Sequence, residues 1–184
     1  MLHVDADRLW SDLMTLGTIG ALPRGGNDRM ALTDADRDGR ALFAHWCAEA
    51  GLTVTVDGIG NMFARREGSD PSLPPVLAGS HLDTQSPGGK FDGPLGVLAA
   101  LAAMRALDAA GVTTRRAIEV VNWTNEEGCR FFPGLMGSAV FAGALSPETA
   151  FAATDRAGRT VAAELARIRA DGPTPIGGRS VDAY

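Results

Sequence analysis

Residues 79–93 organise the rest of this chain and read Gly79-Ser80-His81-Leu82-Asp83-Thr84-Gln85-Ser86-Pro87-Gly88-Gly89-Lys90-Phe91-Asp92-Gly93. The apolar run before them, Pro75-Val76-Leu77-Ala78, predicts a short buried strand of the parallel kind. His81 therefore comes just past the end of a strand, where open α/β sheets gather their reactive groups. His81 and Asp83 stand two residues apart, so in an extended chain their side chains point the same way. One of them could bind an ion while the other orients it.

A second predicted strand, Ala117-Ile118-Glu119-Val120-Val121, also leads into acidic residues. The segment after it reads Asn122-Trp123-Thr124-Asn125-Glu126-Glu127-Gly128. Adjacent glutamates on an irregular segment point in different directions. One of them can bind a cation while its neighbour stays free as a general base, which is the division of labour that a metal-dependent hydrolase needs.

The remaining pattern predicts an α/β domain. A helix between the two strands makes a right-handed crossover, so these strands should pair in parallel. A hairpin is expected where Leu52–Asp57 meets a return strand that begins at Met62. Arg24 and Arg29 lie in a polar loop, as solvated side chains or as anion contacts. Helices are predicted from Asp5 to about Gly17, Thr33 to Gly51, Leu95 to Ala109, Leu135 to Ala142, Pro147 onward and Thr160 to Arg169.

Length and charge exclude several classes of protein. The chain has 184 residues, a hydrophobic fraction of 45% and a formal net charge of −5, which suit one acidic globular domain. An acidic chain without basic runs does not suit a nucleic-acid surface. No apolar run is long enough for a membrane span, and the first residues lack the pattern of a signal peptide, so the cytoplasm is the expected location. Cys47 and Cys129 do not make a disulfide framework.

Three motifs in order carry a family resemblance: Gly-Ser-His-Leu-Asp-Thr at 79–84, Gly-Gly-Lys-Phe-Asp-Gly at 88–93 and Trp-Thr-Asn-Glu-Glu-Gly at 123–128. Together they resemble the carbamoylase branch of the dizinc aminopeptidase-like amidohydrolases. That branch includes N-carbamoyl-L-amino-acid hydrolases, β-ureidopropionases and allantoate amidohydrolases. The resemblance implies a three-layer αβα fold with a mixed, partly parallel central sheet. It also implies hydrolysis of linear ureido or amide compounds by a dimetal-activated water, and a full-length homodimer.

The resemblance also implies a role for each site residue. His81 should ligate one metal, Asp92 should bridge both, and Glu127 should ligate the second. Glu126 should act as the general base, and Asp83 should orient His81. The expected cofactors are two divalent ions, zinc foremost, with manganese, cobalt or nickel as the other candidates.

Relatives of this kind are about twice as long and take two more histidines from later segments. Residues 1–184 are therefore expected to be the N-terminal part of the catalytic domain, without its C-terminal part and without the lid and dimerisation domain. With three of five ligands, the chain alone should bind metal weakly and turn over little. The bond between Asp92 and Gly93 is expected to be cis. The alternatives are a dizinc peptidase or aminoacylase of the same superfamily, and a non-catalytic truncated remnant.

Overall fold

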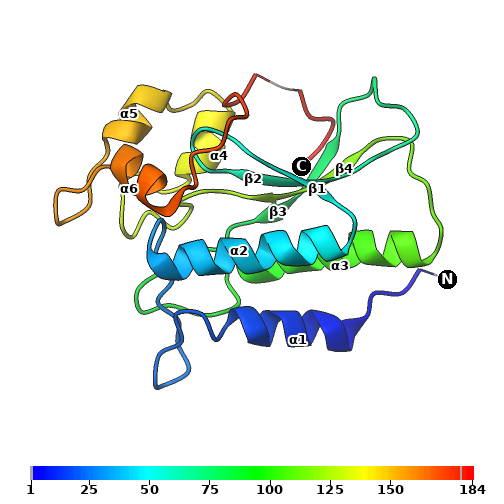
Figure 1. Cartoon of the computed structure of the whole chain (residues 1–184), viewed down its shortest axis with the longest axis horizontal. Coiled ribbons are helices and arrows are strands. Elements are labelled where there is room, and N and C mark those ends of the chain that lie inside the picture. Colours follow the sequence, from blue (N-terminus) through cyan, green and yellow to red (C-terminus); the bar gives the residue numbers. More distant parts are fainter. Residues whose placement is uncertain (1, 179) are drawn as a thin grey trace.

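The computed structural model describes residues 2–178 and 180–184, and it places helices against a central sheet (Figure 1). The strands run in the order β1-β2-β4-β3. β1 pairs with β2 and β2 with β4 in antiparallel fashion, whereas β3 pairs with β4 in parallel. This mixed, partly parallel sheet confirms the predicted fold class. The strands are β1 (Thr53–Val56), β2 (Met62–Arg66), β3 (Val76–Ser80) and β4 (Ile118–Asn122).

One face of the sheet is covered by α2 (Asp34–Glu49) and α3 (Pro94–Ala109), and α1 (Ala6–Leu16) packs on α3 (Figure 1). α1 and α2 begin at their predicted caps, because the side chains of Asp5 and Thr33 each accept a hydrogen bond from a main-chain N–H of the first turn. The main core lies between these helices and the sheet. Its fully buried side chains include Phe43, Leu101 and Val120.

A second group of helices lies at the left end of the sheet in Figure 1: α4 (Met136–Phe141), α5 (Pro147–Ala152) and α6 (Val161–Ile168). They share a core of their own with Ile59 and Phe131. Phe141 of α4 also reaches the outer face of the sheet, where its ring lies 5.2 Å from that of Trp123. Helices therefore contact both faces of the sheet.

The last residues run along the outer edge of β3. Ala183 forms a parallel bridge with Val76, and its carbonyl accepts a hydrogen bond from the Leu77 N–H at 2.9 Å. Trp123 Nε1 donates to the Tyr184 hydroxyl at 2.9 Å. Within the described residues, no helix has the length and apolar character that a membrane crossing requires.

Candidate active site

The parallel pairing of β3 and β4 brings the two acid-bearing segments to one edge of the sheet. His81 follows β3 directly, and the glutamates follow β4 after a short turn. Two hydrogen bonds tie the segments together: the Trp123 N–H donates to the Ser80 carbonyl at 2.8 Å, and the Leu82 N–H donates to Asn122 Oδ1 at 2.8 Å. The sheet therefore fixes where these loops leave it.

His81 is buried and contacts both segments. Its Nδ1 lies 2.7 Å from the main-chain carbonyl of Asp83, and its Nε2 lies 3.2 Å from Glu126 Oε2. A carbonyl can only accept a hydrogen bond, so this contact assigns a proton to Nδ1. Nε2 can then carry a second proton and donate it to the Glu126 carboxylate, or lose that proton and offer its lone pair to a cation. This is the arrangement in which a histidine can ligate a metal through one nitrogen while the other is held by a carbonyl.

Asp83 links the histidine to the two glutamates. Its Oδ1 accepts the main-chain N–H of Glu126 and its Oδ2 that of Glu127, each at 3.3 Å, and Oδ1 lies 3.9 Å from His81 Nδ1. Burial, followed by the charge of Asp36, raises the pKa of Asp83 to about 6. The orienting role expected for Asp83 stays a prediction. The group of Asp83 that contacts His81 most closely is its main-chain carbonyl.

The main chain that follows Asp92, at Gly93, lies close to the His81 ring. A Cβ added to Gly93 would overlap the His81 ring, so the backbone here lies directly against the imidazole. The Asp92 side chain itself is exposed. The bonds before Pro87 and Pro133 are cis, whereas the bond between Asp92 and Gly93 is not, so the cis expectation is wrong.

Glu127 has a different partner from Glu126, because Gln85 Nε2 donates to Glu127 Oε2 at 2.9 Å. Across the described part of the chain, no three His, Cys, Asp or Glu side chains are gathered so that they could hold a metal ion together. The structure thus brings His81, Asp83 and Glu126 into one network. It does not gather the expected ligands His81, Asp92 and Glu127 into one cluster.

The donor chemistry of these residues nevertheless fits divalent cations. One imidazole nitrogen with an available lone pair and several carboxylates at one sheet edge suit Zn²⁺, Mn²⁺, Co²⁺ or Ni²⁺. The close approach of the Asp92–Gly93 backbone to His81 places the main chain of Asp92, the expected bridging ligand, next to the histidine.

The sequence model of Peptidase family M28 matches residues 61–180, which is more than half of the chain. The chain belongs to peptidase family M28. It is 51% identical over 182 residues to an N-carbamoyl-L-amino-acid amidohydrolase of Rhizobium meliloti, with 99% of this chain and 44% of that protein covered. It is 37% identical over 142 residues to a ureidoglycolate hydrolase of Arabidopsis thaliana, with 77% of this chain and 30% of that protein covered.

Solved structures agree with this assignment. A hydantoinase/carbamoylase family amidase from Burkholderia ambifaria superposes with a TM-score of 0.98 at 54% identity, over 100% of this chain and 45% of that one. The similarity to carbamoylases and the α/β fold expected from the motifs are thereby confirmed for this M28 chain. The chain spans less than half the length of these relatives.

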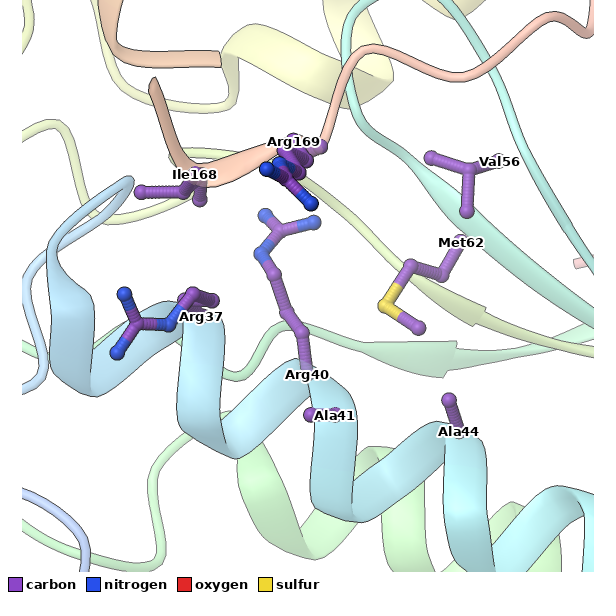
Figure 2. Close-up of a pocket in the computed structure, with 9 residues that line it drawn as sticks. Arg37, Arg40, Ala41, Ala44, Val56, Met62, Ile168 and Arg169 are labelled. Carbon is purple, nitrogen blue, oxygen red and sulfur yellow. The ribbon is translucent and has the colours of Figure 1, made fainter. Parts of the chain in front are cut away.

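Two of the pockets in the M28 chain differ in whether residues next to the candidate site line them. One, of about 210 Å³, lies between α2, the β1–β2 hairpin and the end of α6, and none of the candidate residues lines it (Figure 2). In it the Arg40 side chain extends from α2 toward Arg169, and its Nε bonds Asp36 at 2.9 Å. A second pocket, of about 570 Å³, is lined by Ser86 and Cys129, next to the loops that carry Gln85 and Glu127. The second pocket is therefore the one that borders the loops of the candidate site.

Sequence reasoning missed the residues that support the network. Arg29, expected as a solvated side chain or an anion contact, is completely buried. The side chains of Asn122 and Gln85 also join the two site segments, through hydrogen bonds that no local sequence pattern predicts. Their partners lie forty or more residues away in the sequence. Only the fold brings them together.

Proposed function

We propose that this chain is the N-terminal part of the catalytic domain of a metal-dependent amidohydrolase. Its reaction would be hydrolysis of a C–N bond in linear ureido or amide compounds, with N-carbamoyl-L-amino acids as the first candidates. The observation that carries the proposal is the 3.2 Å contact between His81 Nε2 and Glu126 Oε2 at the ends of two parallel strands. The names and high identity of the amidohydrolase relatives support it. The full-length protein would act in the cytoplasm as a homodimer, with the lid and dimerisation domain outside this chain.

Each site residue has a distinct task in this proposal. His81, Asp92 and Glu127 would hold two divalent cations, zinc foremost. When bound, the cations supply positive charge that polarises the scissile carbonyl and lowers the pKa of water. The Glu126 carboxylate would accept the proton of the attacking water and return it to the leaving nitrogen. Asp83 would keep the main chain of both glutamates in place through its two 3.3 Å hydrogen bonds.

A substrate panel on the full-length protein tests the reaction. N-carbamoyl-L-amino acids, allantoate and ureidoglycolate should be hydrolysed faster than dipeptides, and a chelator should abolish turnover until metal is restored. Glu126→Gln should lower kcat by roughly 10²- to 10⁴-fold. Glu67→Gln, a change at an exposed glutamate bonded to Arg65, is the control and should leave kcat unchanged.

Two results would contradict the proposal. Turnover of dipeptides alone would favour a peptidase of the same family, and no turnover of any of these substrates with metal supplied would favour a non-catalytic remnant. The 184-residue chain by itself should show negligible turnover, because it would supply three of the five ligands that the resemblance implies. Steady ureidolytic activity from the short chain would contradict that ligand count.

A further inference from the structure

Arg29 is a completely buried arginine whose side chain reaches two separate segments of the chain. Its Nε donates to the Leu82 carbonyl at 2.8 Å, and its Nη1 donates to the carbonyls of Leu16 at 3.1 Å and Ile19 at 2.8 Å. Leu16 is the last residue of α1, and Leu82 lies between His81 and Asp83. One side chain therefore ties the end of α1 to the segment that carries the candidate histidine.

The main chain of Arg29 holds the same segment a second time, through Thr84. The Arg29 N–H donates to Thr84 Oγ1 at 2.9 Å, and the Thr84 N–H donates to the Arg29 carbonyl at 3.0 Å. Farther along the same loop, Asn27 and Gly88 exchange main-chain hydrogen bonds at 2.9 Å in both directions. Residues 27–29 thus line one side of the loop that follows β3.

The Arg29 side chain passes α2 at Gly39, where the helix has no side chain. A Cβ on Gly39 would stand 2.9 Å from Arg29 Cδ, so any larger residue at this position would push against the arginine. Glycine in a helix interior is unfavourable relative to alanine, because it loses more conformational freedom on folding. Its presence in the middle of α2 is explained by the room that it leaves for Arg29.

These contacts anchor both peptide planes that flank Asp83. The plane between Leu82 and Asp83 is held through its C=O, which accepts from Arg29 Nε. The plane between Asp83 and Thr84 is held through its N–H, which donates to the Arg29 carbonyl. A peptide unit is planar and trans, so fixing its N–H also fixes the direction of its C=O. The C=O of this second plane is the group that lies 2.7 Å from His81 Nδ1.

We propose that Arg29 and Thr84 are positioning residues that act through the Asp83 peptide to set the orientation of the His81 ring. With Nδ1 held by the Asp83 carbonyl, Nε2 is directed at Glu126 and at the place where a cation would bind. The consequence for metal binding rests on the proposed function, whereas the effect on the imidazole does not. Burial lowers the pKa of the Arg29 guanidinium, and the nearby carboxylates of Asp36 and Asp83 partly offset this effect.

Nuclear magnetic resonance on the metal-free 184-residue chain tests the proposal. The chain has three histidines, and His3 and His45 are exposed, so the buried His81 ring can be identified after ¹⁵N labelling. In the unmodified chain, His81 should carry a slowly exchanging proton on Nδ1. Thr84→Val removes the hydroxyl acceptor and Arg29→Met removes the guanidinium. Both should speed exchange of the His81 Nδ1 proton and of the Thr84 amide by about tenfold, as expected for the loss of one hydrogen bond.

Matched variants separate positioning from general stability. Thr84→Ser keeps the hydroxyl and should restore slow exchange at both protons. Arg66→Met removes another largely buried arginine, bonded to Asp108 and to the Val112 carbonyl, and should leave both exchange rates unchanged. If Arg29→Met does not fold, the Thr84 pair decides the question. Unchanged exchange in folded Thr84→Val, or no proton on Nδ1 in the unmodified chain, would overturn the proposal.

Zn²⁺ titration of the full-length protein then tests the link to metal binding. Thr84→Val should weaken Zn²⁺ affinity by about tenfold, whereas Arg66→Met should not change it. If the unmodified protein binds no Zn²⁺ or other divalent metal, the proposed function fails while the resonance result still decides the positioning role. If metal binds with equal affinity in both variants, the link between ring orientation and affinity is refuted.

Discussion

Replacing Gly93 by alanine should destabilise the chain through two separate effects at the candidate site. Gly93 has φ 82 and ψ −63, outside the regions that L-residues populate, and such strain costs about 1–3 kcal/mol. The new Cβ would also overlap the His81 ring and its carbonyl oxygen, and overpacking of this kind costs about 1–3 kcal/mol more. The free energy of unfolding should therefore fall by about 2–6 kcal/mol, a large share of the 5–15 kcal/mol typical of a domain.

Urea denaturation followed by tryptophan fluorescence measures this loss. With a slope of about 2 kcal/mol per molar, the midpoint should fall by about 1–3 M without a change in slope. Gly111→Ala is the matched control, because Gly111 also has a positive φ, 64°, but its added Cβ would have no heavy atom within 4 Å. That control should lose only about 1–2 kcal/mol. Equal losses in the two variants would refute the claim that the Asp92–Gly93 backbone is packed against His81.

Three further changes test the core and its buried charges. Arg40→Met should lower the free energy of unfolding by about 3–5 kcal/mol, because it leaves a buried carboxylate unpaired; the exposed-pair control Arg8→Met should lose at most about 1 kcal/mol. Leu101→Ala, at a fully buried position, should lose about 2–5 kcal/mol in the same denaturation assay. Burial raises the pKa of the Cys47 thiol to about 12, so at pH 8 a thiol reagent should titrate only the exposed Cys129 in the folded chain and both thiols in urea. Two reactive thiols in the folded chain would contradict the buried position of Cys47.

Local sequence signals predicted most of the secondary structure. Asp5 and Thr33 mark helix starts because their side chains satisfy main-chain N–H groups within the same turn. The parallel pairing of β3 with β4 followed from the intervening helix, because a strand–helix–strand unit has essentially one handedness. These inferences need only residues that are close in the chain, which is why they were confirmed.

Long-range contacts gave a different result. Arg29 looked like a loop residue, and nothing near it in the sequence indicates that its partners are Leu82 and Thr84. Gly39, in the interior of α2, is likewise explained only by a distant residue, because an added Cβ would lie 2.9 Å from Arg29 Cδ. The contact of Asp83 with His81 was expected through the carboxylate, and the shorter one is through the main-chain carbonyl.

The sequence by itself determined the helices, the strands, the acidic segments at two strand ends and, through three motifs, the family. Only the tertiary structure decided which groups hold His81 in place, and that Asp92 and Glu127 are not gathered around it within the described residues. The physical reason is the range of the interactions. Caps, turns and hydrophobic periodicity act over a few residues, whereas a buried hydrogen bond between residues 29 and 82 exists only after the chain has folded around it.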